Sequence, residues 1–194
     1  MYVAAAKFRV LIAITDVEEV FIMAKKNSKK ISTEKIVVIG FMIALEVVLS
    51  KLLSINISFL RIGFGFLPIV ILAILYGPQW AGIAYAIGDV IGALLFPTGA
   101  YFPGFTLTAY CTGVMFGLVL YNKKKISFKR ALVASALVCT LCNLLLNTYV
   151  LTFVLGKGFK VLLASRAVKE LVAIPVMAVL IVAIDRTVIK VVKK

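Results

Sequence analysis

Six apolar stretches, separated by short polar or basic breaks, follow one another along the chain. They are residues 36–53, 66–76, 81–96, 105–121, 128–148 and 171–189. A helix that crosses a bilayer needs roughly 20 mostly apolar residues, and five of the stretches approach that length. The second stretch is shorter, but residues 62–78 bring it near spanning length. The pattern therefore predicts an all-α integral membrane protein with six transmembrane helices.

The composition excludes a purely soluble protein. Hydrophobic residues make up 63% of the chain and charged residues 15%, whereas an ordinary soluble domain is about 45–50% apolar and about 25% charged. Such an excess of apolar residues cannot be buried inside a globule of this size. The six stretches also leave no room for a separate soluble domain. We therefore expect one six-helix membrane domain over residues 35–190, followed by a cytoplasmic tail, residues 191–194.

Residues 1–34 are expected to form an N-terminal leader and a basic cytoplasmic segment. Residues 1–22 hold only a short apolar run followed by three acidic residues, too short and too acidic to span a bilayer. A second methionine, Met23, precedes Ala24-Lys25-Lys26 and resembles a natural start. We expect the residues before Met23 to be either an amphipathic leader or the product of a start codon assigned too early.

Basic residues are distributed unevenly between the two sides of the predicted membrane domain. The chain has 22 Lys and Arg against 8 Asp and Glu, a net charge of +14. With both termini in the cytoplasm, the cytoplasmic segments hold fourteen of the basic residues, as the positive-inside rule requires. These need no partner other than the anionic lipid of the bilayer, and we expect no nucleic acid partner. The outer segments hold six: Lys51, Arg61, Lys157, Lys160, Arg166 and Lys169; Lys7 and Arg9 of the leader complete the 22.

Three of the outer cations are candidates for ligand binding. Arg61 stands at the mouth of the second predicted helix, and Arg166 and Lys169 stand three residues apart at the start of the sixth. This spacing places Arg166 and Lys169 on one face of a helix. We predict that the three form a positively charged pocket, open to the outside, for an anionic solute. For the other three outer cations, snorkelling to the membrane interface is the alternative.

The connection between the third and fourth predicted helices is rich in aromatic rings. Phe96, Tyr101, Phe102 and Phe105 fall within ten residues, with two prolines and two glycines among them. An aromatic belt at the membrane interface is the alternative, but a belt does not require these prolines and glycines. Their composition indicates a rigid, shaped loop that presents flat ring faces. Such faces beside cations suit a planar ring that carries a carboxylate tail.

Several kinds of site are excluded by residues that the sequence lacks. Without histidine the chain has no Ser-His-Asp triad, no His-based zinc site and no haem-ligating histidine. It also has no Gly-x-x-x-x-Gly-Lys-Ser/Thr phosphate-binding loop. Cys139-x-x-Cys142 lacks further metal ligands and, with Ser135, is better explained by helix packing. We therefore predict neither a catalytic nor a metal site.

Three acidic residues lie in or near the predicted spans, where an ionisable side chain is a functional candidate. Glu170 follows Arg166 by four residues, so a local ion pair is the simplest interpretation, and hydrogen bonding to a ligand is the alternative. Asp89 could cap a helix or pair within the bundle. Glu46, on the first helix, could contact another subunit. None of the three is assigned to the binding site.

Two segments resemble those of a known family. RIGFGFLP, residues 61–68, is similar to the opening of the second helix in S components of energy-coupling factor (ECF) transporters. DVIGALLFPTGAYFPGFT, residues 89–106, is similar to the stretch typical of folate-binding S components, the FolT type. Asn147, near the end of the fifth predicted helix, and Arg166-x-x-Lys169 also fit. The resemblance covers nearly the whole predicted membrane domain.

The resemblance implies a six-helix protein of the bacterial cytoplasmic membrane with both termini inside. Such a subunit binds folate at high affinity near the outer face and hydrolyses no ATP. It associates with a transmembrane scaffold subunit and two ATPase subunits, so it needs no cofactor of its own. Family members dock their first helix on the scaffold through small residues four apart. Gly40 and Ala44 fit that spacing, with ordinary helix packing as the alternative.

The resemblance also assigns parts of folate to particular side chains. Aromatic residues of the loop would stack on the pterin ring, while an asparagine or a carboxylate would accept its N–H groups. Basic residues would bind the glutamate tail, first Arg166 and Lys169 and then Arg61. Asn143 is an alternative to Asn147 as acceptor. The predicted substrate-binding residues are Arg61, Tyr101, Phe102, Phe105, Asn147, Arg166 and Lys169.

Other functions remain as rivals to folate binding. An S component for another vitamin, thiamin or riboflavin, shares the first motif. A membrane-embedded enzyme that acts on lipids is disfavoured because the chain lacks histidine and a pair of acids on facing loops. A channel or stand-alone carrier is a third possibility, and the absence of an internal repeat disfavours a carrier.

Overall fold

The computed structural model describes residues 33–51, 55–57, 60–97, 101–123, 125–155 and 159–192. The predicted leader, including Met23, lies outside these residues, as do Lys157 and the last two residues of the predicted tail. For Arg61 and Lys160 the structure describes the backbone only. All statements below concern the described residues.

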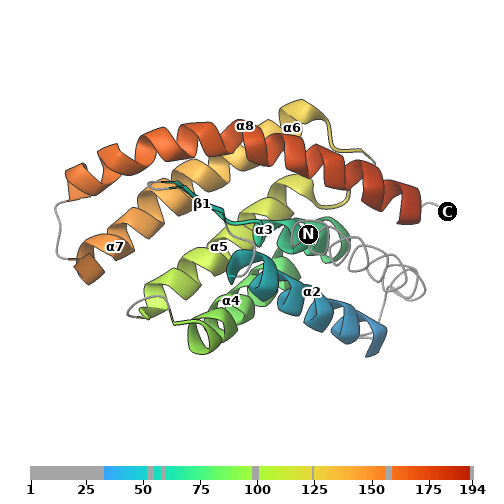
Figure 1. Cartoon of the computed structure of the whole chain (residues 1–194). Helices are drawn as coiled ribbons and strands as arrows, with labels where there is room; N and C mark the ends of the chain where they lie inside the picture. Colours follow the sequence, from blue (N-terminus) through green and yellow to red (C-terminus); the bar gives the residue numbers. More distant parts are fainter. Residues whose placement is uncertain are drawn as a thin grey trace, which may run out of the picture.

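Six helical stretches make up the described bundle (Figure 1). The first four are α2 (Thr33–Lys51), α3 (Phe66–Tyr76), α4 (Pro78–Leu95) and α5 (Pro103–Leu120). The fifth joins α6 (Phe128–Leu137), the π-helix η1 (Val138–Leu146) and α7 (Asn147–Leu155), and the sixth is α8 (Phe159–Val192). Pro78 and Pro103 begin α4 and α5, where a missing N–H costs no hydrogen bond. The predicted six-helix, all-α architecture is confirmed.

Several predicted boundaries are wrong. A short antiparallel hairpin, β1 (Ile55–Ile57) with β2 (Leu60–Ile62), precedes α3, so the second helix has the predicted bounds 66–76 and its wider range, 62–78, is wrong. Arg61 therefore lies in a strand, opposite Asn56, and not at a helix mouth. Ile55, Ile57 and Ile62 favour a strand because their side chains branch at Cβ.

The last two helical stretches are longer than predicted. The fifth continues to Leu155, so Asn147 lies within it and not near its end. The sixth begins at Phe159, twelve residues before the predicted start at 171. Arg166 and Lys169 therefore lie in the second and third turns of α8 and not at its beginning. Polar and basic residues around Arg166 hid the first turns of α8, since a hydropathy pattern detects only apolar turns. Residues 149–155 are largely apolar, and the fifth stretch was ended too early at residue 148.

Helix α5 lies between two groups of helices (Figure 1). On one side α8 runs alongside the α6–η1–α7 stretch, and on the other α2, α3 and α4 pack together. A Cβ atom at Gly113 of α5 would lie 2.5 Å from the backbone oxygen of Ala81, so only glycine permits this close approach to α4. The Phe66 and Phe116 rings stack at 6.4 Å between centroids and join α3 to α5 in the core.

Large apolar side chains cover much of the outer surface. Leu94 is 77% exposed, Leu171 69% and Leu118 65%, and each lies on a different helix. Soluble proteins rarely expose apolar surface on this scale, whereas lipid tails accept it. By length and composition, α5, residues 128–154 and residues 166–186 can each cross a membrane, and α3 is a shorter apolar helix. The exterior is therefore that of a protein surrounded by lipid.

Candidate functional site

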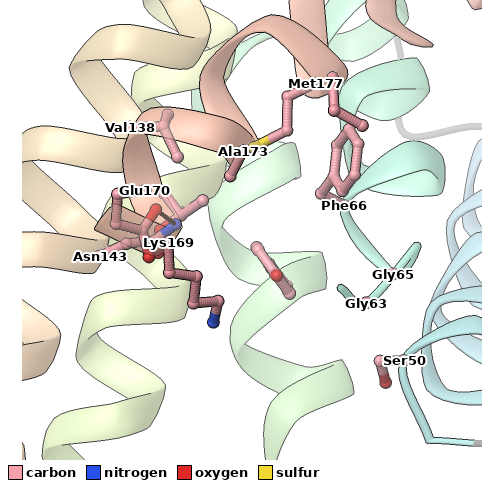
Figure 2. A pocket seen from close by; sticks show the side chains of 13 residues that line it. Ser50, Gly63, Gly65, Phe66, Val138, Asn143, Lys169, Glu170, Ala173 and Met177 are labelled. Atoms are coloured by element: carbon pink, nitrogen blue, oxygen red, sulfur yellow. Dashed lines mark hydrogen bonds between the residues drawn. The ribbon is translucent and has the colours of Figure 1, made fainter. Parts of the chain in front are cut away.

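A cavity of about 160 Å³ lies where the helical groups and the segment before α3 meet (Figure 2). Helix α8 provides one wall, because Lys169, Ala173 and Val176 recur at the spacing of one helix face. The opposite wall comes from the segment that links β2 to α3, and α2, α4, α5 and η1 complete the lining. The lining residues are Ser50, Gly63, Gly65, Phe66, Tyr85, Thr112, Val138, Asn143, Lys169, Glu170, Ala173, Val176 and Met177.

The cavity has an apolar part and a polar part. Phe66 and Met177 lie together at one end, and Asn143, Lys169 and Glu170 lie together at another (Figure 2). The Asn143 Nδ2 donates a hydrogen bond of 3.4 Å to Oε2 of Glu170. Glu170 is only 5% exposed. The site thus combines a surface for a flat apolar group with a buried carboxylate, an amide and an ammonium group.

The π-helix places Asn143 in this wall. In η1 each N–H bonds five residues back, as in the bond from the Asn147 N–H to the Cys142 oxygen. A π-helix turns each residue by less than an α-helix does, so its insertion changes which side chains face α8. The Cys139 thiol of the same segment donates to the Met177 sulfur at 3.6 Å. These contacts hold η1 against α8 beside the cavity.

The Asp89 carboxylate of α4 is hydrogen-bonded, through Thr106, to Tyr101 just before α5. The Tyr101 hydroxyl donates to Oγ1 of Thr106 at 2.7 Å, and Thr106 donates to Oδ2 of Asp89 at 2.8 Å. We orient the first bond in this way because Thr106 has only one hydroxyl hydrogen, which Asp89 accepts. Asp89 therefore pairs within the bundle, one of the two roles considered for it. The chain of bonds fixes the start of α5 against the end of α4.

Comparison with known proteins identifies the family. A family model described as "ECF transporter, substrate-specific component" matches residues 34–184. The chain belongs to this family. The S component is also 46% identical over 142 residues to "Folate transporter FolT" of Clostridium novyi (strain NT), covering 73% of this chain and 82% of the relative. A "Folate transporter FolT" of Leuconostoc mesenteroides subsp. mesenteroides is 32% identical over 152 residues, covering 76% and 82%.

A solved structure shares the fold of the S component. "Crystal structure of FolT bound with folic acid" superposes with a TM-score of 0.74 at 33% sequence identity. The match covers 80% of this chain and 95% of the solved chain. The bundle described above is therefore the fold of an ECF S component.

The predicted basic residues of the S component are only partly brought together. Lys169 lines the cavity, and the half-buried Arg166 lies one turn nearer the start of α8. Arg61 belongs to β2, whose partner residue is Asn56, and its side chain lies outside the described part. The structure therefore places one of the three predicted cations in the cavity wall and a second beside it.

The other predicted residues lie nearer the outer ends of the helices. Tyr101 and Phe102 are exposed at the start of α5, and Phe105 is half-buried two turns before Thr112. Asn147 lies one turn beyond Asn143, and its buried Oδ1 has no hydrogen-bond partner within the described chain. None of these four residues lines the cavity. All four lie on the outer side of it along their helices.

Sequence reasoning missed several polar lining residues of the S component. Ser50, Tyr85 and Thr112 lie in largely apolar helices, where a hydroxyl is as well explained by packing. Phe66 lies within residues 61–68, the segment that resembles other S components, so this resemblance could have identified it as a site residue. Glu46 is buried beside the site at 3% exposure, with its carboxylate against Gly88 of α4. Gly88 lies on another helix, 42 residues from Glu46, so the sequence gives no signal of this contact.

Proposed function

We propose that this S component binds folate at high affinity and delivers it across the bacterial cytoplasmic membrane, together with a transmembrane scaffold subunit and two ATPase subunits. One observation carries the proposal: the solved relative, which matches 80% of the chain at a TM-score of 0.74, is titled as bound to folic acid. Both curated relatives are also named folate transporters. The S component itself performs no catalysis and needs no cofactor, because the partner subunits use the ATP.

The dimensions of the cavity support a ligand that extends beyond it. Pockets that enclose a drug-sized ligand usually measure about 300–1,000 Å³, whereas this cavity measures about 160 Å³. It therefore accommodates one end of folate. Arg166, Phe105 and Asn147 lie one or two helical turns outward from the cavity, along the path that the remainder of an elongated ligand takes.

The side chains in and beyond the cavity wall have the chemistry that the remainder of folate requires. Arg166 and Lys169, with Arg61, provide cations for the two carboxylates of the glutamate tail. Tyr101, Phe102 and Phe105 provide ring faces for the aromatic parts of the ligand, and Asn147 provides an amide. Because Asp89 fixes Tyr101 through Thr106, the start of this aromatic group is ordered without a ligand.

Helix α2 provides a surface for the scaffold subunit. Gly40 and Ala44 are exposed, and a Cβ atom at Gly40 would have no neighbour within 4 Å. The exposed Ile36, Val37 and Val48 lie on the same helix. Small residues surrounded by apolar ones let a helix of another subunit approach closely within lipid. We propose that this face docks on the scaffold, in a multi-pass subunit with both termini in the cytoplasm.

Isothermal titration calorimetry of the purified S component tests the proposal. We expect folate to bind tightly at one site, and thiamin and riboflavin to give no binding heat. An S component that binds thiamin or riboflavin, and not folate, would contradict the assignment of the vitamin while leaving the family unchanged. Titration in lipid nanodiscs provides a control for effects of detergent on the cavity.

A further inference from the structure

We propose that the connection between α5 and α6, held against α8 by Asp185, binds the phosphate headgroup of an anionic phospholipid at the cytoplasmic face of the membrane. The proposal goes beyond folate binding and does not depend on which vitamin the cavity accepts. It concerns exposed basic side chains in and next to this connection, which we call the basic corner: Lys123, Lys125, Lys129 and Arg130.

The basic corner lies at the level of the lipid headgroups. Helix α5 is long and apolar enough to cross a membrane, and so are residues 128–154, which follow it. A short connection between two such helices lies at the membrane surface. Lys129 and Arg130 belong to the first turn of the second span, where long basic side chains extend toward the headgroups. The exposed rings of Tyr121 and Phe128 flank the corner, as is typical of a membrane interface.

The cations of the corner have no carboxylate on their own elements. No acidic residue occurs between Asp89 and Glu170, a stretch that includes α5, α6 and their connection. Asp185 of α8 reaches the connection, but it is only 4% exposed. Its Oδ2 accepts a hydrogen bond of 3.0 Å from the backbone N–H of Ile126, so this oxygen is engaged by the backbone. Neighbouring cations repel one another, and the phosphate of an anionic lipid relieves that repulsion.

The backbone that carries the cations is fixed before any lipid binds. The Ile126 side chain is 5% exposed and belongs to the core, while its N–H is bonded to Asp185, 59 residues away in sequence. Before it, Asn122 adopts a left-handed φ of 56°, a conformation that asparagine tolerates, and the chain turns away from α5. After it, the Ser127 oxygen accepts the N–H of Arg130 at 2.9 Å as α6 begins. A preformed site loses less conformational entropy when a headgroup binds.

A general attraction between positive charge and anionic lipid is the competing explanation. Asp185 separates the two explanations, because Asp185→Ala and Asp185→Asn both remove the acid and leave every cation in place. Asparagine keeps a side-chain oxygen that can accept the Ile126 N–H, whereas alanine has none. General attraction requires both variants to bind anionic lipid at least as well as the wild type. A built site requires Asp185→Ala alone to lose affinity.

The test titrates the full chain, purified in neutral detergent, with short-chain phosphatidylglycerol, followed by native mass spectrometry and by the thermal unfolding midpoint. We expect phosphatidylglycerol to bind more tightly than phosphatidylcholine and to raise the midpoint. Replacing three cations of the corner by glutamine should weaken phosphatidylglycerol about 100-fold, from roughly fivefold for each cation. The replaced residues are Lys123, Lys125 and Arg130. The charge-matched control replaces three basic residues of the C-terminal end and should retain most of the affinity: Lys190, Lys193 and Lys194.

The Asp185 variants form the second arm of the test. Asp185→Ala should weaken phosphatidylglycerol about 10-fold, the loss typical of one hydrogen bond, and Asp185→Asn should retain the wild-type affinity. Folate affinity, measured by calorimetry, should equal that of the wild type in every variant, which shows that the bundle is folded. If Asp185→Ala does not fold, the glutamine variant and its charge-matched control decide the proposal.

Several results would overturn the proposal. Equal affinity of the wild type for phosphatidylglycerol and phosphatidylcholine would do so, as would equal weakening in the glutamine variant and its control. Equal lipid affinity of Asp185→Ala and Asp185→Asn would remove Asp185 from the site. A midpoint raised as much by glycerol 3-phosphate would indicate a site for a free phosphate compound. A glutamine variant that keeps its lipid affinity but no longer copurifies with the ATPase subunits would assign the corner to a protein partner.

Discussion

At the scale of single residues, the site brings charges of opposite sign together on one helix. Arg166 lies one turn outward from Glu170, and Lys169 lines the cavity beside it. The two cations offset the charge of this intramembrane acid, since an unpaired charge in this position is costly.

Arg166→Ala should weaken folate binding about 10- to 100-fold, because it removes a charged hydrogen-bond donor worth about 1.5–3 kcal/mol. The thermal unfolding midpoint should change little, since Arg166 is only half-buried. Calorimetry with pteroic acid, which lacks the glutamate, supplies the contrast: its affinity should change less than that of folate. Arg186→Ala, at an exposed position of the same helix, is the control. Unchanged folate affinity would remove Arg166 from the site.

At the scale of elements, the apolar stretches of the sequence located the six helices but did not give the residues at which some of them begin and end. The turns of α8 around Arg166 carry polar and basic residues that hydropathy does not count as membrane, whereas the extension of the fifth helix to Leu155 is apolar and its end was placed too early, at residue 148. The hairpin of β1 and β2 depends on pairing between Ile55 and Ile62, which a local pattern cannot reveal. Likewise η1 depends on packing against α8, so the position of Asn143 in the cavity wall was not predictable.

Gly113→Ala tests whether close approach of α4 and α5 stabilises the bundle. Its Cβ would lie 2.5 Å from the Ala81 backbone oxygen, so the helices must move apart. Overpacking of this kind typically costs about 1–3 kcal/mol, which thermal unfolding in detergent would detect as a lower midpoint. Gly40→Ala is the matched control, because that Cβ has open space and alanine favours a helix by about 0.5–1 kcal/mol. Equal midpoints for the two variants would show that the contact is unimportant.

At the scale of the whole molecule, α2 joins the proposed docking surface to the cavity. Gly40 and Ala44 are exposed on this helix, whereas Met42 and Glu46 are buried and Ser50 lines the cavity. The sequence identified the outward pair through its spacing, but the inward contacts of Glu46 with Gly88 required the folded bundle. A rigid helix with two such faces can respond to both the ligand and the scaffold, so the two functions should be separable by substitutions on opposite faces.

Ala44→Trp tests this separation. The indole would project from the exposed face of α2 and prevent close approach of a scaffold helix, while the cavity on the other side remains unchanged. We expect folate affinity to equal that of the wild type by calorimetry, and copurification with the scaffold and ATPase subunits to be lost. Val179→Trp, on an exposed position of α8, places the same ring in lipid elsewhere and should leave assembly intact. Retained assembly in Ala44→Trp would show that the scaffold binds another face, and loss of folate binding would show that the two faces of α2 are not independent.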